Sequence, residues 1–288
     1  MLRSLRKKIV EASLSANELA RIDQAPLHLN SAGIDEWGLD PDTIKTAAAV
    51  CKLLYRNYFR VECSGIENIP QGRCLLIANH SGQIPIDAML ILMSLILDGK
   101  PPRIVRGMVE RWVPTLPFVS AFFMRLGQLV GDQHNGKDML NRNETVLVFP
   151  EGTRGCGKTY FERYTLKRFG TGFVRLALET KTPIVPVAVI GCEETYPGLV
   201  KLDKIAKYFG APYFPVTPFF PWLGFLGMVP LPAKVTIRYG DPIYFEGEPD
   251  MPEVEVQKMV DRVKNAIMKE FEIGLEKRGD HVFTKAAL

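Results

Sequence analysis

Residues 79–87 carry two side chains that could act together in proton transfer. His80 is followed seven positions later by Asp87. An imidazole titrates near neutrality, and it becomes a well-oriented base when its second ring nitrogen donates a hydrogen bond to a carboxylate. A loop that folds back between the two residues would bring them together. The segment therefore predicts a histidine base oriented by an aspartate.

Residues 149–155, Phe-Pro-Glu-Gly-Thr-Arg-Gly, add groups that could bind a substrate. The two glycines bracket a turn that could expose backbone N–H groups. Arg154 is a permanent cation whose planar fork of donors suits phosphate or carboxylate. Glu151 could accept a hydrogen bond from a substrate hydroxyl or hold Arg154 in place. The segment predicts a binding turn for a polar or anionic group.

Both segments follow short apolar runs, residues 74–78 and 145–149, that predict buried strands. Residues just beyond the carboxyl ends of parallel strands line the crevice in which ligands bind. Because the two segments occupy that position, we expect them to face one cleft. Their combination in one chain predicts an active site.

The rest of the chain alternates apolar strands with helices. Further strands are expected at residues 59–63, 103–105, 184–190 and 235–239, and helices at 41–57, 85–97, 168–180 and 252–276. This order predicts an α/β fold, a single layered domain with a mostly parallel sheet flanked by helices, plus an N-terminal helical extension. We expect the extension to span residues 1–54, the main domain residues 55–250, and a C-terminal amphipathic helix packed on that domain residues 251–288.

Composition and charge exclude several classes of protein. With 47% hydrophobic and 24% charged residues among 288, the chain should bury a sizeable core rather than be disordered. A net charge of +4 is too small to indicate nucleic-acid binding. The five cysteines have no CxxC spacing, which favours reduced thiols and argues against a zinc site. We expect no bound metal and no cofactor.

Three blocks together resemble a known family. They are the His80–Asp87 segment, the Phe-Pro-Glu-Gly-Thr-Arg segment at 149–154 and the strand at 184–187, Ile-Val-Pro-Val. In order and spacing they resemble the glycerophospholipid acyltransferase family, whose type member acylates 1-acylglycerol-3-phosphate. The resemblance covers about residues 55–245.

This resemblance implies an O-acyltransferase of phospholipid biosynthesis. His80, oriented by Asp87, would remove a proton from an acceptor hydroxyl. The alkoxide would then attack the thioester of an acyl-CoA or acyl-carrier protein, which acts as co-substrate. Glu151, Gly152, Thr153 and Arg154 would hold the acceptor, with Arg154 on its phosphate. The implied partners are the acyl donor, a lysophospholipid or other lipid acceptor, and a membrane surface.

Two features depart from the family pattern. Six residues separate His80 from Asp87, where the family has four, and this spacing leaves an inactive lipid-binding relative as one alternative. Gln133 stands where the family's middle block places an arginine for the acceptor phosphate. The uncharged side chain of Gln133 leaves a second alternative open, an acyltransferase with a neutral acceptor such as diacylglycerol or a long-chain alcohol. Two clusters of basic residues could contact CoA phosphates or anionic headgroups instead: Arg103, Arg106 and Arg111, and Lys158, Arg163, Lys167 and Arg168.

No stretch reaches the ~18 uninterrupted apolar residues that a membrane-spanning helix needs. We therefore expect a peripheral or monotopic protein on the cytoplasmic face of a membrane, without a transmembrane helix. A basic amphipathic helix at residues 2–12 and a charge-free aromatic segment at residues 208–232 are candidates for membrane contact. The aromatic segment, residues 86–97 and residues 112–124 are also candidates to line an acyl-chain tunnel.

Overall fold

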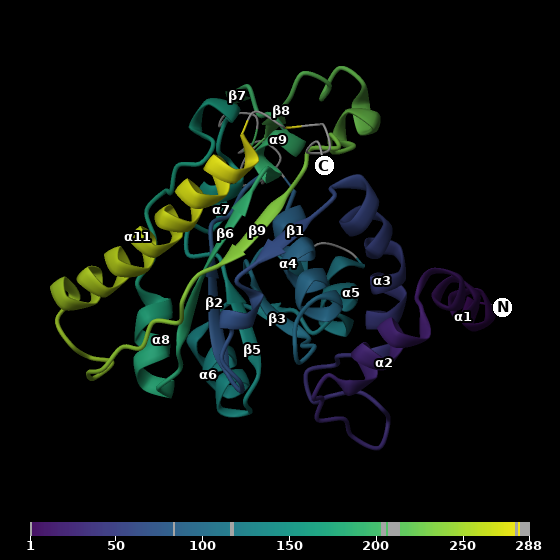
Figure 1. Ribbon diagram of the computed structural model, residues 1–288, viewed down its shortest axis with the longest axis horizontal. Coiled ribbons are helices and arrows are strands. Elements are labelled where there is room, and N and C mark those ends of the chain that lie inside the picture. Colours follow the sequence, from purple (N-terminus) through teal and green to yellow (C-terminus); the bar gives the residue numbers. More distant parts are fainter. Residues whose placement is uncertain are drawn as a thin grey trace.

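A twisted, mostly parallel sheet forms the centre of the molecule. The computed structural model describes residues 2–82, 84–115, 118–202, 206, 214–279 and 282. Within these residues seven strands pair in the order β1-β9-β6-β2-β5-β3-β4 (Figure 1). They are β1 (Glu62–Ser64), β2 (Cys74–Ala78), β3 (Val105–Val109), β4 (Leu129–Val130), β5 (Thr145–Val148), β6 (Ile184–Ile190) and β9 (Thr236–Tyr239).

The pairing of the strands follows from their burial. Every residue of β2 and β6 is buried, as expected of strands that are covered by helices on both faces. All neighbours pair in parallel except β6 and β9, which run antiparallel. The sequence-based α/β fold class with a mostly parallel sheet is therefore confirmed.

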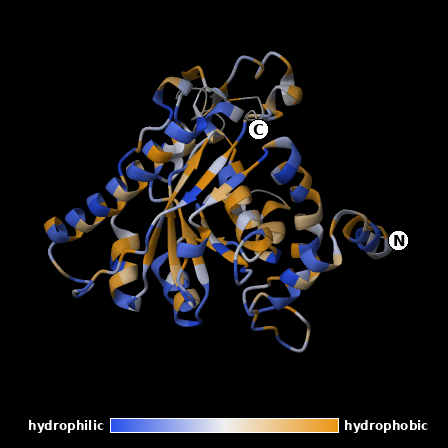
Figure 2. Ribbon diagram, viewed as in Figure 1, coloured by the Kyte–Doolittle hydropathy of each residue, from blue (hydrophilic) through white to orange (hydrophobic). Residues whose placement is uncertain are grey.

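Helices cover both faces of the sheet. The core has two halves because neighbouring side chains of a strand point to opposite faces: Leu76 packs with helices α3 and α4, whereas Leu75 packs with α6, α8 and α11. Figure 1 shows the two groups of helices on either side of the strands, and Figure 2 shows that the strands between them are largely apolar. The bounds of these helices are α3 (Pro41–Leu53), α4 (Ile86–Leu97), α6 (Gln133–Asn141), α8 (Gly172–Thr180) and α11 (Glu253–Arg278).

The N-terminal part of the chain is helical, with bounds α1 (Leu2–Ser13) and α2 (Ala16–Gln24) ahead of α3. Asp40 caps α3 by accepting a hydrogen bond from the backbone N–H of Asp42, as its position before Pro41 predicts. The chain continues from α3 into one π-helical turn at Leu54–Tyr58. The predicted helix over residues 41–57 therefore exists, but its last turn is not α-helical.

Short elements fill the connections between strands and helices. They are α5 (Val119–Arg125), α7 (Thr153–Cys156), α9 (Cys192–Thr195), a two-stranded ribbon of β7 (Val200–Lys201) and β8 (Pro215–Val216), and 3₁₀ turns at Ile66–Asn68, Val113–Thr115, Tyr160–Glu162 and Gly224–Met228. Among the residues described, no helix combines the length and the apolar character that crossing a bilayer requires.

Candidate active site

The two chemistry-bearing segments lie at the same edge of the sheet. His80 follows the end of β2, and Glu151 follows the end of the neighbouring β5. Asp87 lies in the first turn of α4, and its side chain is fully buried. The structure thus brings the two predicted segments together, as the carboxyl ends of parallel strands require.

His80 and Asp87 form a direct pair. The Nδ1 of His80 lies 2.7 Å from the Oδ2 of Asp87. The carboxylate also accepts hydrogen bonds of 2.8 Å from the backbone N–H groups of Ser81 and Ala88. Since an ionised carboxylate only accepts, Nδ1 carries a proton and Nε2 is the nitrogen left to act as a base.

The six-residue spacing is accommodated by a tight turn. Gly82 adopts a φ of +81°, a conformation that side chains rarely tolerate. Pro85 precedes α4, and the N–H of Ile86 donates to the carbonyl of Ile84, which tightens the entry into the helix. Gln83 lies outside the described residues. The longer loop still places Asp87 beside the imidazole.

Charge and packing both act on the imidazole of His80. Burial is the largest single effect and disfavours the imidazolium, but Asp87 and Cys156 together outweigh it, so the pKa of His80 stands well above its ordinary value. Phe149 stacks on the ring at 4.2 Å between centroids. A Cβ on Gly155 would lie 2.6 Å from the Cβ of His80, so only glycine lets this turn approach so closely. The ring is therefore held on several sides.

Glu151 lies behind the imidazole and is only 1% exposed. Its Oε1 accepts a hydrogen bond of 2.9 Å from the backbone N–H of His80, and its Oε2 accepts one of 2.7 Å from that of Lys167. Both oxygens are thus occupied by the protein's own backbone. In this position the carboxylate joins the segment after β2 to the segments after β5, and its expected contact with the acceptor stays a prediction.

A buried cation stands next to Glu151. The Nζ of Lys158 lies 3.6 Å from Glu151 Oε2 and 3.4 Å from Oε1 of Glu193, and it donates to the carbonyl of Thr165 at 3.0 Å. Burial raises the pKa of the Glu193 carboxyl, although Lys158 opposes that effect. The sequence offers Lys158 only as a contact for phosphates and does not assign Glu193 to the site. The only signal was the position of each just after a motif that the sequence did reveal.

The remaining predicted site residues face different surroundings. Gly152 has a φ of +57°, so glycine is required where the chain turns into α7. Thr153 lines the cavity described below. Arg154 is exposed, and its Nε lies 3.5 Å from the carbonyl of Glu151. The Nε2 of Gln133 donates to the carbonyl of Gly172 at 2.9 Å.

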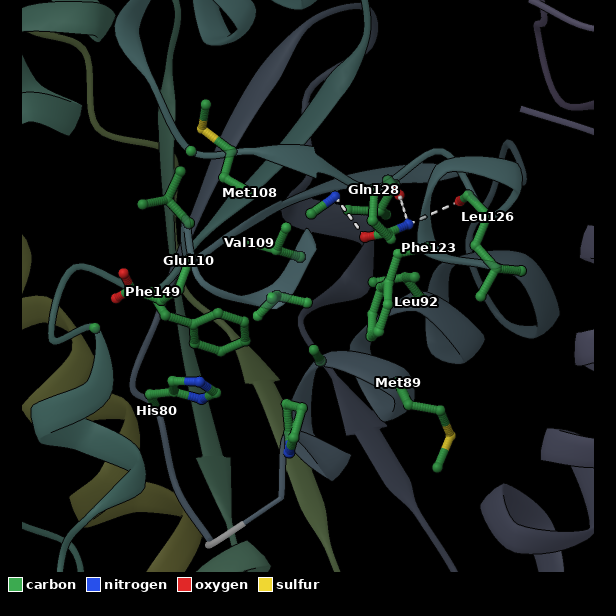
Figure 3. Close-up of a pocket in the computed structure, with 18 of the residues that line it drawn as sticks. His80, Met89, Leu92, Met108, Val109, Glu110, Phe123, Leu126, Gln128 and Phe149 are labelled. Atoms are coloured by element: carbon green, nitrogen blue, oxygen red, sulfur yellow. Dashed lines mark hydrogen bonds between the residues drawn. The ribbon is translucent and has the colours of Figure 1, made fainter. Parts of the chain in front are cut away.

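An apolar cavity of about 870 Å³ opens beside His80. Figure 3 shows His80 and Phe149 on one side of it, Met89 and Leu92 of α4 along it, and Leu126 on the far side. Other apolar lining residues come from α3, β3 and α5: Ile44, Ala47, Ala48, Cys51, Val105, Met108, Val109, Val119, Phe122 and Phe123. The expectation that residues 86–97 and 112–124 line an apolar tunnel agrees with this cavity. Its lining also includes α3, which sequence reasoning did not include.

The aromatic segment expected at residues 208–232 takes a different place. Its residues 208–213 lie outside the described part of the chain, and the described residues that follow are not among those that line the cavity. Five of their large apolar side chains are instead 40–76% exposed: Phe219, Trp222, Leu223, Leu226 and Val229. Residues 228–231 are anchored to α9 and its neighbours, because Tyr196 donates to the carbonyl of Met228 and Leu231 donates to that of Thr195. The interpretation of these described residues as tunnel lining is wrong.

Several basic residues expected to meet phosphates are engaged elsewhere. Arg106 is fully buried and paired with two buried carboxylates, and Arg103 donates to backbone carbonyls beside β2. Lys158 is buried behind Glu151. The interpretation of these three side chains as anion contacts is wrong, because each is already paired and shielded from solvent. Arg111 is exposed and does line the cavity.

Known proteins share this arrangement of motifs. The model of the family described as Acyltransferase matches residues 60–190. An uncharacterized protein of Mycobacterium tuberculosis is 38% identical over 243 residues, which cover 82% of this chain and 68% of that protein. The chain belongs to the acyltransferase family. The family resemblance inferred from the sequence motifs is thereby confirmed.

Two further proteins are similar to this acyltransferase. The DGAT1/2-independent enzyme synthesizing storage lipids of Mus musculus is 25% identical over 72% of this chain and 58% of its own length. The crystal structure of the 1-acyl-sn-glycerophosphate (LPA) acyltransferase of Thermotoga maritima matches 80% of this chain and 81% of its own at 19% identity, with a TM-score of 0.48.

Proposed function

We propose that this acyltransferase moves a fatty acyl group from a thioester to the hydroxyl of a lipid, with His80 as the general base. The observation that carries the proposal is the His80–Asp87 pair beside an apolar cavity of about 870 Å³. A fatty acyl chain needs such an apolar space, and a hydroxyl needs a base to become a nucleophile. The pair and the cavity supply both at one place.

In the proposed reaction, Nε2 of His80 takes the proton of the acceptor hydroxyl while the oxygen attacks the thioester carbonyl. The tetrahedral intermediate collapses as the C–S bond breaks, and the imidazolium returns its proton to the leaving thiolate. Asp87 keeps Nδ1 protonated and stabilises the imidazolium that forms. Because Asp87 raises the pKa of His80, the base is strong once it is neutral.

The donor in this proposal is an acyl-CoA or an acyl-carrier protein. Its acyl chain would lie in the cavity along α4, with the thioester next to His80. Arg111 is an exposed cation in the cavity lining, and it is placed to meet a phosphate of the donor or the acceptor. Arg154, which is exposed just after Gly152, is a second candidate to contact a substrate phosphate.

The acceptor is proposed to be a lysophospholipid such as 1-acylglycerol-3-phosphate, or a neutral lipid alcohol. The family resemblance supports the first. A specific contact supports the second, because Gln133, at the expected arginine position, is uncharged and already donates to the carbonyl of Gly172. The mouse relative, by its name, synthesizes storage lipids, which supports a lipid acceptor of either kind.

A membrane surface is the proposed place of action. Long-chain acceptors reside in bilayers, and two segments of the chain expose apolar side chains that suit contact with a bilayer surface. They are the segment around Trp222 and Leu226 and the basic helix α1, whose Leu5 is exposed. We propose a peripheral or monotopic association on the cytoplasmic face.

Thiol release by the purified protein tests the function. Free CoA is measured from palmitoyl-CoA alone, with 1-acylglycerol-3-phosphate, and with monoacyl- and diacylglycerol, and the panel is repeated with an acyl-carrier protein as donor. The expected result is acceptor-dependent release that His80→Ala reduces by at least about 100-fold. His134→Ala, at an exposed histidine of α6, serves as the matched control. Release by His80→Ala within tenfold of the wild type would exclude the proposed base, and silence across both donors and all acceptors would favour a lipid-binding protein.

A further inference from the structure

An unpaired carboxylate lies in the cavity next to the candidate base. Glu110 follows the end of β3, is exposed, and lines the cavity with His80. Figure 3 shows it on the same side of the cavity as Phe149, the residue that stacks on His80. Of the residues that the structure describes, none forms a hydrogen bond or an ion pair with this carboxylate.

The carboxylate of Glu110 lies against the turn at Gly152. A Cβ placed on Gly152 would lie 2.7 Å from the Oε1 of Glu110, so the carboxylate packs directly against that glycine. Gly152 belongs to the turn that the family resemblance assigns to the acceptor. The negative charge therefore occupies the place where the polar part of an acceptor would approach His80.

The other charged groups in the cavity lining do not neutralise this carboxylate. The Oδ1 and Oδ2 of Asp132 are occupied by the backbone N–H and the side chain of Asn135 at the start of α6. Gln133 contributes no charge. Arg111 is a cation in the lining, and it is one positive charge against two carboxylates. A phosphate beside Glu110 would be repelled by this carboxylate, whereas Arg111 and the imidazolium form of His80 would attract it.

We propose that Glu110 determines which acceptor this enzyme uses. Its carboxylate accepts hydrogen bonds from the hydroxyls of an uncharged, hydroxyl-bearing lipid such as a monoacylglycerol, and it repels an acceptor that carries a phosphate. A carboxylate is the side chain suited to this discrimination, because it is an acceptor only and is charged at neutral pH. The inference rests on the proposed acyl transfer and narrows its acceptor class.

The expected size of the effect follows from Coulomb's law. A carboxylate and a phosphate of charge about −1.5 to −2, separated by roughly 7 Å in a partly solvated site, repel each other enough to change relative binding by about five- to twentyfold. The effect should shrink with added salt, since the site is open to solvent. Removing the carboxylate would also remove its hydrogen bonds to an uncharged acceptor, and this too would shift the preference toward the phosphorylated acceptor.

The test compares kcat/KM for 1-acylglycerol-3-phosphate and for monoacylglycerol in the wild type, Glu110→Gln and Glu110→Lys. Glu276→Gln, at an exposed residue of α11 away from the cavity lining, is the matched control. We expect the wild type to favour monoacylglycerol. The ratio should move toward the phosphorylated acceptor by about tenfold in Glu110→Gln and further in Glu110→Lys, more strongly at low salt.

Three outcomes would overturn the proposal, and they are distinguishable. If the wild type transfers acyl groups but the acceptor ratio of Glu110→Gln stays within twofold of wild type at low salt, Glu110 does not select the acceptor. If the wild type releases thiol with no acceptor of the full panel, diacylglycerol included, on either donor, the proposed function itself fails and this role fails with it. A wild-type preference for the phosphorylated acceptor would also contradict the inference.

Discussion

Replacing Asp87 by asparagine is the most direct test of the proposed pair. The carboxylate stands 2.7 Å from Nδ1 and holds the proton there, whereas an amide can donate its own N–H to Nδ1 and so favour the opposite tautomer. The variant also loses the charge that stabilises the imidazolium. At a charge separation of about 4 Å and an effective dielectric constant of about 20, that charge contributes about 4 kcal/mol. Part of this stabilisation acts in the transition state, where the imidazolium is forming, so kcat should fall by about 10²- to 10³-fold in Asp87→Asn.

The pH dependence gives a second, independent readout. Asp87 raises the pKa of His80, and the base must be neutral to act, so the wild-type rate should rise with pH through a value above the ordinary imidazole range. In Asp87→Asn the acid limb should move to lower pH. The same raised pKa means that the folded state holds its proton more tightly than the unfolded state. This contribution to the free energy of unfolding is present below the unfolded pKa and is lost as pH rises through the folded pKa.

The assay is acceptor-dependent thiol release measured from pH 5 to 10, with urea denaturation at two pH values. Asp241→Asn, at an exposed position, controls for the loss of a surface charge. An Asp87→Asn variant whose rate is within tenfold of wild type, and whose acid limb does not move, would refute the reasoning. It would mean that the observed pair does not serve proton transfer.

Three further sets of substitutions test other features of the structure. Lys158→Met leaves two buried carboxylates without this cation and should lower the free energy of unfolding by about 3–5 kcal/mol, and Glu193→Gln in the same chain should recover part of that loss. If urea denaturation finds Lys158→Met within about 1 kcal/mol of the wild type, the ion pair does not stabilise the fold. Ala47→Leu adds bulk to the cavity lining on α3 and should lower kcat/KM for long acyl chains about fourfold per displaced methylene, while kcat/KM for short chains stays the same. Equal effects on C8 and C16 donors would contradict this. The double variant Trp222→Ala/Leu226→Ala should bind phosphatidylglycerol-containing liposomes at least about tenfold more weakly in a co-sedimentation assay, and its rate on detergent-dispersed substrate should not change. If the amount of protein that sediments with liposomes is unaltered, this segment has no role in membrane binding.

The elements around the site could be predicted because their signals are local. The apolar runs that become β2 and β6 match the observed strands residue for residue, and the helix predicted at 252–276 is observed at Glu253–Arg278. The pairing of His80 with Asp87 followed from residue types, and the structure adds the 2.7 Å contact despite the longer spacing. The antiparallel direction of β9 could not be predicted, because it depends on pairing with β6 across about 50 residues.

The wrong interpretations involve partners that are distant in sequence. Arg106 was a candidate contact for phosphates, yet it is buried and paired with Asp35 and Glu144, which lie 71 and 38 residues away. The expected contact of Glu151 with the acceptor stays a prediction, but the sequence could not show that both of its oxygens accept hydrogen bonds from backbone N–H groups. Side-chain identity therefore predicted which groups gather at the site better than it predicted which way each of them faces.

Helix α3 lies outside residues 60–190, the part of the chain that matches the family model, yet it forms part of the wall of the cavity. The backbone N–H of Asp40, at the start of α3, donates to the carbonyl of Arg125 at the end of α5, which places this helix near Leu126 and so across the cavity from His80. One part of the wall that would hold the acyl chain in the proposed reaction is thus encoded outside the stretch that carries His80 and Asp87. If the proposed reaction holds, mutations in α3 would reshape the space for the acyl chain without touching the His80–Asp87 pair, so acyl-chain preference could diverge while the chemistry is kept.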